Sequence, residues 1–198
     1  MTHGGYDRAL LLAYDALSKR EPLDIVANTG VVWDGAGYAV PWYGELRPLA
    51  SGGADEQIIW LHYMLGQGPK APRGRYIAYK QVPGAAIYDG NFAKRCIDPM
   101  VKTFKDDLTG FAACGEIIGG RAASLGDASF TVDMLPYIPL TFVLWQGDDE
   151  VPSNGNILFD ETAIEWLCPE DLVVLAGLPV YKMIGMARSK AGGDGDHT

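Results

Sequence analysis

The sequence has few cysteines, and they lie far apart. Cys96, Cys114 and Cys168 are the three cysteines of a 198-residue chain. No C-x-x-C pair occurs, so the ligand spacing of zinc sites, iron–sulfur clusters and dithiol redox centres is missing. We therefore expect three reduced and mostly buried thiols, since a free cysteine behaves as a small hydrophobic residue.

Long apolar runs and a secretory leader are also missing. No stretch of about 18 consecutive apolar residues is present. The opening segment, MTHGGYDRALLLAYDALSKRE, has no basic region ahead of a long apolar stretch, and Asp15 interrupts it. These features predict a soluble, cytoplasmic protein with no membrane span and no membrane partner.

Basic charge is scarce overall, and it is unevenly placed. The formal net charge is −9, which argues against a nucleic-acid partner, because phosphate binding needs clustered Lys and Arg. Residues 122–181, the acidic segment, carry ten acidic and no basic side chains, whereas residues 70–105, the basic strip, carry eight basic and two acidic ones. We expect the two segments to face each other; alternatively, the acidic segment binds a cation or a basic partner and the basic strip an anionic ligand.

Motifs for phosphate binding and serine hydrolysis are absent as well. The chain has no G-x-x-x-x-G-K-[ST], no G-x-G-x-x-G between a strand and a helix, and no G-x-S-x-G. In IGGRAASLGD, Gly119, Gly120 and Arg121 could cradle an anion. A helix end followed by a turn is the commoner reason for such glycines, so we expect a turn there.

What the sequence does contain is a series of short elements separated by 25 glycines and 12 prolines. Pro41 and Pro48 restrict the segment between them to an edge strand or a loop. Apolar periodicity and turn residues predict helices over 6–18, 22–30, 54–68, 92–104 and 108–118 and strands over 31–33, 38–40, 75–80, 128–135 and 140–145. Pro22 opens the second of these helices and Gly30 is placed to end it. The alternation over 128–135 predicts a half-buried strand, and the continuous apolar run over 140–145 predicts a central one. This order indicates an α+β fold with a central, mainly antiparallel sheet and helices at both ends of the chain. We expect one domain over residues 1–190 and a disordered tail over residues 191–198.

The C-terminal part carries clear helix signals. Thr162 and Glu165 form a capping-box pattern, and Pro169 suits the first turn of a further helix. The pattern predicts that this helix ends at Gly177 and that another starts at Pro179, because proline fits only the first helical turn.

Aromatic side chains beside segments of opposite charge predict a ligand pocket. The predicted ligand-binding residues are Trp60, His62, Tyr76, Tyr79 and Trp145, with Asp148 and Glu150 at the rim. His62 is the one histidine away from the chain ends and lies on an apolar helical face, so it is either a hydrogen-bonded core residue or a pocket residue. A nucleophilic pair of His62 with Cys114 has no supporting motif.

Acidic side chains cluster after the last predicted strand. Asp148 and Glu150 alternate along the chain there, and Asp160 would approach them if the chain turned back alongside. Carboxylates in this arrangement would suit Mg²⁺ or Ca²⁺. In the alternative interpretation, Asp148 and Asp149 shape a turn, Asp160 binds a backbone N–H near the next helix, and Glu150 pairs with the basic strip.

The stretch from Gly126 to Asp171 resembles a known family. The matching residues are Gly126-Asp127 before a strand, Pro136 and Pro139, Trp145 followed by Asp148 and Glu150, the sequence ILFD, and Leu167, Glu170 and Asp171. LHYML and VPGAAIY extend the likeness over most of the chain. The sequence thus resembles an uncharacterised domain-of-unknown-function family found mainly in anaerobic bacteria and archaea. Val151 departs from the family pattern, in which an aromatic residue commonly follows the D-x-E.

The resemblance implies a role in anaerobic metabolism, because some family members carry an added four-cysteine iron–sulfur domain. This chain lacks that domain, so a cluster would come from an iron–sulfur or redox protein partner. We therefore expect a domain that binds a small ligand or cofactor of unidentified chemistry. The alternatives are a divalent-metal-assisted hydrolase or transferase that uses Asp148, Glu150 and Asp160, and an interaction module of a redox complex.

Overall fold

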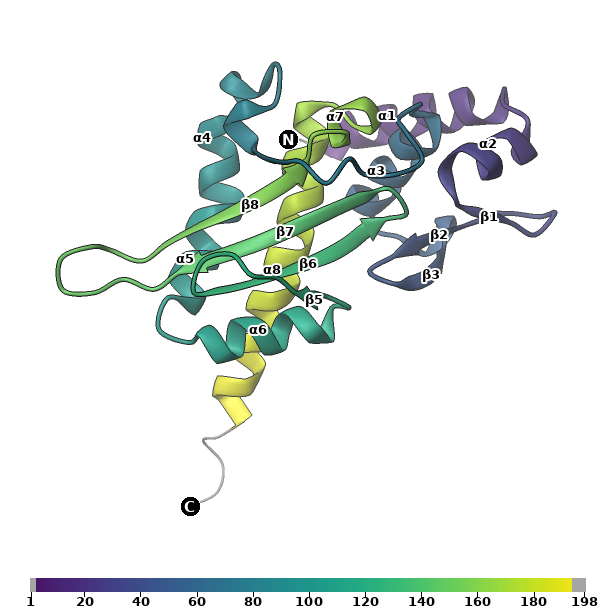
Figure 1. The fold of residues 1–198 in the computed structure, drawn as a ribbon. Coiled ribbons are helices and arrows are strands. Elements are labelled where there is room, and N and C mark those ends of the chain that lie inside the picture. The colour runs from purple at the N-terminus through teal and green to yellow at the C-terminus, as the bar shows by residue number, and fades with distance from the viewer. Residues whose placement is uncertain (1–2, 194–198) are drawn as a thin grey trace.

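The computed structural model describes residues 3–193 and has the predicted α+β architecture (Figure 1). The N-terminal part contains α1 (His3–Ser18), α2 (Pro22–Thr29), a three-stranded antiparallel sheet of β1 (Val32–Trp33), β2 (Tyr38–Trp42) and β3 (Glu45–Pro48), the 3₁₀ turn η1 (Leu49–Ser51) and α3 (Ala54–Leu65). Gly30 ends α2 with a φ of 72°, as the predicted Pro-first, Gly-last pattern requires. Pro41 lies in β2 beyond the two residues that pair with β1, and Pro48 ends the edge strand β3, so the segment between the two prolines is a turn and an edge strand, as predicted.

A five-stranded antiparallel sheet forms the centre of the molecule, in the order β4-β8-β7-β6-β5. Its strands are β4 (Tyr76–Ala78), β5 (Arg121–Ala122), β6 (Ala128–Leu135), β7 (Ile138–Trp145) and β8 (Asn154–Asp160). The continuously apolar β7 is the central strand, as predicted, because both of its edges are paired. β6, β7 and β8 follow one another along the chain, whereas β4 joins β8 from much earlier in the sequence.

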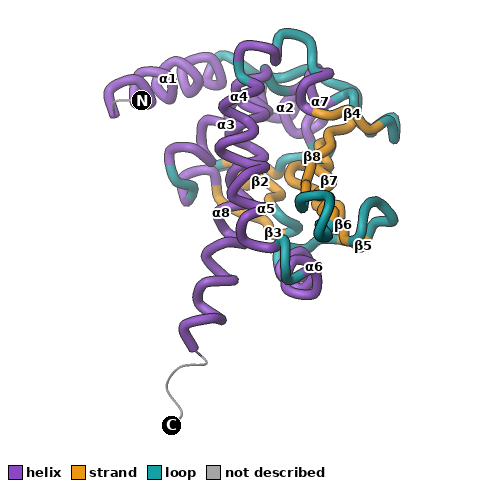
Figure 2. The backbone as a smooth tube through the Cα atoms, turned by 90° about the vertical axis from the view of Figure 1, so that its left-hand side faces the viewer, coloured by secondary structure: helices purple, strands orange, loops and turns teal. Residues whose placement is uncertain are grey.

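Helices cover one face of this sheet, as the edge-on view shows (Figure 2). Between β4 and β5 the chain forms the 3₁₀ turns η2 (Tyr79–Gln81) and η3 (Ala85–Ile87), then α4 (Asp89–Phe92), the π segment η4 (Ala93–Ile97), α5 (Asp98–Phe104) and α6 (Leu108–Ile117). Aromatic rings fill the space between layers: Phe111 lies 4.9 Å from Phe130, which stacks on Phe142 at 5.2 Å. The alternation of β6 thus buries Phe130 beneath the helices, as the period of two predicts.

The C-terminal helices differ from the predicted pattern. After α7 (Ala163–Trp166), α8 (Pro169–Gly193) is one continuous helix with Pro179 inside it. The predicted break at Gly177 and Pro179 is therefore wrong. Proline in a helix interior costs about 3 kcal/mol, and burial offsets this cost, since most residues of α8 from Leu172 to Ile184 pack into the core.

α8 is also the one helix among residues 3–193 that is long and apolar enough to cross a membrane by length and composition. More than half of its apolar window, 56%, is buried inside the protein, which is typical of a core helix. The tail predicted to be disordered begins inside this helix, and residues 194–198 lie outside the described residues.

The predicted capping box at α7 is not formed. Thr162 makes no side-chain capping bond to the helix; its hydroxyl instead donates a hydrogen bond to Asp160 at 2.6 Å. Thr162 has helical backbone angles, φ −77° and ψ −13°, whereas a capping residue is normally extended, so its hydroxyl is not placed to accept a hydrogen bond from the first turn.

Candidate functional site

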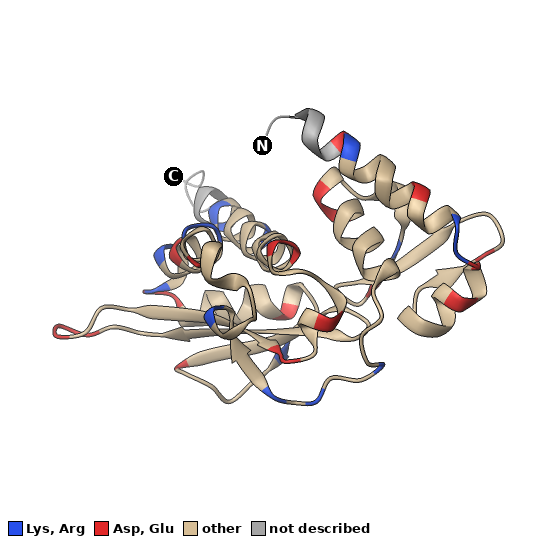
Figure 3. Ribbon diagram, turned by 90° about the horizontal axis from the view of Figure 1, so that it is seen from above, with Lys and Arg blue, Asp and Glu red and all other residues tan. Residues whose placement is uncertain are grey.

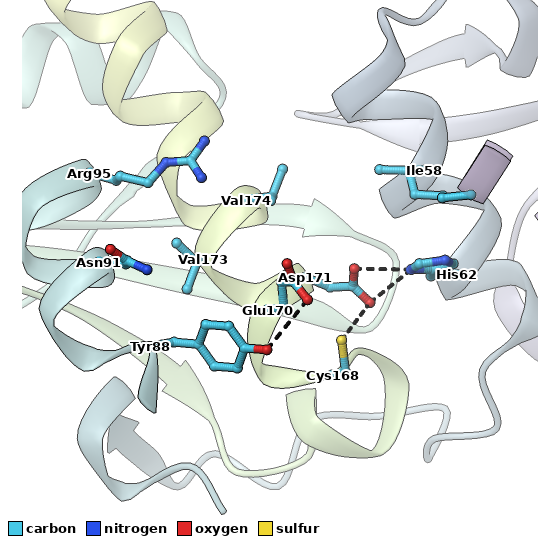
Figure 4. A pocket seen from close by; sticks show the side chains of 11 residues that line it. Ile58, His62, Tyr88, Asn91, Arg95, Cys168, Glu170, Asp171, Val173 and Val174 are labelled. Atoms are coloured by element: carbon cyan, nitrogen blue, oxygen red, sulfur yellow. Dashed lines mark hydrogen bonds and ion pairs between the residues drawn. The ribbon is translucent and has the colours of Figure 1, made fainter. Parts of the chain in front are cut away.

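A cavity of about 240 Å³ lies where α3, α4 with η4, and the first turn of α8 meet (Figure 4). Ala9 of α1 closes one side. Ile58, Val173 and Val174 supply apolar wall, and polar side chains come from both flanks. This volume lies below the roughly 300–1,000 Å³ of pockets for drug-sized ligands, so the cavity suits a smaller molecule.

His62 is the polar group that α3 contributes. It follows Ile58 by one helical turn and therefore points to the same side of α3. Its Nδ1 lies 3.0 and 2.9 Å from the two carboxylate oxygens of Asp171 on α8. The hydrogen bond to Asp171 raises the pKa of His62 above its usual value, although partial burial opposes the change.

Cys168 joins the same network at the start of α8. Its carbonyl accepts the hydrogen bond of the first helical turn from Leu172 N–H, and its thiol donates to Asp171 Oδ2 at 3.2 Å. Cys168 is exposed as a residue, but partial burial raises the pKa of its thiol, and the negative charge of Asp171 adds to that increase, although backbone N–H groups oppose it. The sulfur is therefore a protonated hydrogen-bond donor near neutral pH and not a thiolate nucleophile.

This protonation state predicts the reactivity of the thiol. At pH 7.5, iodoacetamide should alkylate Cys168 of the Asp171→Asn variant about 3- to 10-fold faster than in the parent, because loss of the carboxylate charge lowers the thiol pKa. Mass spectrometry of the Cys168 peptide over time measures the rate, with buried Cys96 and Cys114 as slow internal references. Asp149→Asn, at an exposed and distant carboxylate, is the control. An unchanged or slower rate in Asp171→Asn would contradict the assigned role of Asp171.

The opposite wall carries Tyr88, Asn91 and Arg95. Tyr88 donates a long hydrogen bond, 3.5 Å, to Glu170 Oε2 at the start of α8. Within residues 3–193, no ion pair involves Arg95 and no hydrogen bond involves the Asn91 side chain. Two polar side chains thus line the cavity with unused hydrogen-bonding capacity.

The π segment positions Arg95. Buried residues in the continuous helix recur every fourth position, at Phe92, Cys96, Met100 and Phe104. This spacing exceeds the 3.6 residues of an α-helical turn, and a π turn accommodates the additional residue while the buried side chains remain on one face. Arg95 lies within this wider turn, next to buried Cys96, and lines the cavity.

Most residues of the predicted pocket do not meet. Only His62 lines the cavity; Tyr79 is buried behind it and donates its hydroxyl to the carbonyl of Pro169 at 2.8 Å. Trp60 is fully buried against Trp42, on another side of α3.

Two further aromatic residues of that set lie on the five-stranded sheet. Tyr76 is in edge strand β4, and Trp145 ends β7 at the opposite end of the sheet; both are exposed. Asp148 and Glu150 lie beyond Trp145, in the projecting, acidic turn between β7 and β8 (Figure 3). The structure therefore separates these four residues from His62.

The three acids proposed as metal ligands also remain apart. Asp148 Oδ1 accepts hydrogen bonds from the backbone N–H groups of Glu150 and Val151, at 2.9 and 2.7 Å, so it shapes the turn. Asp160 lies at the other end of β8, roughly 20 Å away for a strand of this length. Among residues 3–193, no group of three His, Cys, Asp or Glu side chains could hold a metal ion.

Asp160 instead organises the start of β4. Its two oxygens accept hydrogen bonds from the backbone N–H groups of Arg73, Gly74, Arg75 and Thr162 and from the Thr162 hydroxyl. Burial alone would raise the pKa of Asp160, but these hydrogen bonds hold it below its ordinary value. The predicted structural role of Asp160 near the next helix is thus confirmed.

Ion pairs link the basic strip to the acidic segment at one place. Arg73 contacts Glu161 and Glu165, and Arg75 contacts Glu161, at distances from 2.9 to 3.7 Å. The prediction that the two segments face each other is confirmed there. The predicted pairing of Glu150 with the basic strip is wrong, because no ion pair among residues 3–193 involves Glu150, which lies in the turn between β7 and β8.

The glycine-rich IGGRAASLGD forms the expected turn. Gly119 has a φ of 80°, and the N–H of Gly120 donates to the carbonyl of Gly115 at 2.8 Å, which ends α6. Arg121 pairs with Asp133 across neighbouring strands, so it is not free to bind an anion.

Sequence reasoning missed Asp171, Cys168, Glu170 and Arg95. Cys168 was expected to be buried like Cys96 and Cys114, yet it is exposed. The available signal was the sequence CPED, in which a cysteine precedes the helix-initiating Pro169 and an acid stands in the first turn.

The fold and the cavity together define an α+β domain of unknown function with a small cavity, lined by apolar and polar side chains, at the start of α8. The chain belongs to the family described as Domain of unknown function (DUF3786), whose model matches residues 21–182. This range contains every cavity residue named above except Ala9. No curated protein and no solved structure matches the chain at a significant level. The expected membership of an uncharacterised domain family is confirmed.

Proposed function

We propose that the domain binds a small amphipathic molecule in the cavity between α3, η4 and α8. The observation that carries the proposal is the division of polar groups around the cavity. One wall holds the linked side chains of His62, Asp171 and Cys168, and the other holds Arg95 and Asn91, which have no partner among residues 3–193. A mainly apolar wall with a few polar groups that point into the cavity is the usual composition of a ligand site.

The geometry favours binding over catalysis at this site. The thiol of Cys168 is protonated, and the carboxylate of Asp171 is already shared by two donors. The metal-assisted alternative lacks a cluster of ligands among residues 3–193, because Asp148 and Asp160 lie at opposite ends of β8. A role in anaerobic metabolism, with a ligand supplied in the cytoplasm, remains consistent with the proposed binding function.

A thermal-shift screen of small metabolites tests the proposal. We expect at least one compound to raise the melting temperature of the parent and of Lys94→Trp but not of Asn91→Trp. Asn91 lines the cavity and is exposed, so tryptophan there should fill the cavity without disturbing the core; exposed Lys94 on the same helix lies outside it. A screen without hits, or hits that stabilise Asn91→Trp equally, would refute the proposal.

A further inference from the structure

The charged side chains around the cavity are arranged as a pair of opposite, separated charges. Arg95 lies on η4 and Glu170 in the first turn of α8; both line the cavity, and no ion pair joins them (Figure 4). Arg95 is a permanent cation, since a guanidinium is always protonated in proteins. Among residues 3–193, neither Arg95 nor Glu170 forms an ion pair.

Glu170 is the acid with spare capacity. Asp171 accepts hydrogen bonds from His62 and from Cys168, so both of its oxygens are used. Glu170, by contrast, receives only the long hydrogen bond of Tyr88 at 3.5 Å among the described residues. The N-terminal end of α8 favours Glu170 as an anion, because the helix dipole is positive there.

The placement of these charges decides which part of a ligand binds where. The start of α8 would attract a ligand carboxylate, but Glu170 and Asp171 already occupy that end with negative charge. Arg95, supported by the amide of Asn91, is then the favourable place for a carboxylate, since a guanidinium matches its two oxygens. A ligand cation is favoured at Glu170.

We infer that the ligand is a small zwitterion, a free α-amino acid with a modest apolar side chain. This inference rests on the proposed binding function and names its ligand class. The carboxylate binds Arg95 and Asn91, the ammonium group binds Glu170, and the side chain packs on Ile58, Val173 and Val174. The cavity of about 240 Å³ limits the side chain to a small one.

Isothermal titration with L-valine, L-leucine and L-methionine tests the inference. We expect at least one to bind the full chain, and L-leucine has matched probes that each lack one charge: 3-methylbutylamine lacks the carboxylate and 4-methylpentanoate lacks the ammonium. Each single-charge probe should bind about tenfold or more weakly, because one charge-assisted contact is lost.

Two variants test whether Arg95 binds the carboxylate of the ligand and Glu170 binds its ammonium group. Arg95→Gln should weaken the binding amino acid about tenfold or more while leaving the affinity of the matched amine unchanged. Glu170→Gln should also weaken the binding amino acid about tenfold or more, but it should leave the affinity of the matched acid unchanged. Circular dichroism and melting temperature establish that each variant is folded, and Lys94→Gln on the same helix is the control.

The measurements distinguish a failure of the zwitterion inference from a failure of the proposed binding function. If the metabolite screen finds a ligand that Asn91→Trp excludes, but that ligand carries one charge or none and the amino acids do not bind, the zwitterion is refuted and the binding function stands. If the amino acids bind but Arg95→Gln and Glu170→Gln leave their affinity unchanged, the zwitterion is likewise refuted. If nothing binds, both proposals fail.

Discussion

Replacing Asp160 by alanine should lower the free energy of unfolding by about 3 kcal/mol, because several donors lose their acceptor at once. Asp160 is 3% exposed, and its carboxylate accepts five hydrogen bonds from the chain entering β4 and from Thr162. Urea unfolding followed by tryptophan fluorescence measures the change. Asp149→Ala, at an exposed acid in the β7–β8 turn, should change stability by less than about 0.5 kcal/mol.

Asparagine should not rescue this position. Oδ1 faces the donors of Arg73 and Thr162, and Oδ2 faces those of Gly74 and Arg75, so either orientation of an amide places its NH₂ group against N–H donors. We therefore expect Asp160→Asn to lose nearly as much stability as Asp160→Ala. An Asn variant as stable as the parent would contradict the assigned hydrogen bonds.

The effect should also depend on pH. Because the folded-state pKa of Asp160 is lowered, its contribution to stability is complete above the unfolded pKa of about 3.9 and is lost as pH falls through the folded value. The stability difference between the parent and Asp160→Ala should be constant above about pH 5 and shrink below about pH 4. A difference that stays constant down to pH 2.5 would show that the charge of Asp160 is not the cause.

Gly115→Ala should destabilise the domain by about 2 kcal/mol, since an added methyl group overpacks the contact between α6 and β6. A Cβ at Gly115 would lie 2.5 Å from the ring of Phe130, and that ring is held between Phe111 and Phe142. The usual gain of alanine over glycine in a helix, about 1 kcal/mol, is smaller than this clash.

Gly185→Ala is the matched control for that substitution. Gly185 lies in α8, and a Cβ added there would meet no side chain or neighbouring element within 4 Å, so alanine should stabilise the domain by about 0.5–1 kcal/mol. Thermal unfolding of both variants measures the two changes. Equal effects of the same sign would show that helix propensity, and not the Phe130 contact, determines the outcome at Gly115.

Local patterns were sufficient to predict much of the fold. The alternation of β6 and the continuous apolar run of β7 correctly predicted a half-buried and a central strand, because the side-chain period reports burial directly. α8 was divided wrongly at Pro179, since local propensity does not include the burial that holds the helix together.

The site could be predicted only in part, because its contacts join distant parts of the chain. His62 was recognised as a pocket candidate, but its partner Asp171 lies 109 residues further on. The acids at Asp148 and Asp160 were proposed to converge, yet antiparallel pairing of β7 and β8 places them at opposite strand ends. A sequence shows that a chain turns back, but the register decides which side chains meet.

The π segment has a consequence for how sequences of this family can vary in length. Removing one residue from Ala93–Ile97 would allow an ordinary α-helix, in which Phe92 and Met100 stand about two turns apart and both remain on the buried face. The side chains inside the segment would change direction instead, so Arg95 would turn away from the cavity. Homologues that keep the cavity should therefore conserve the length of this helix even where its exposed residues change.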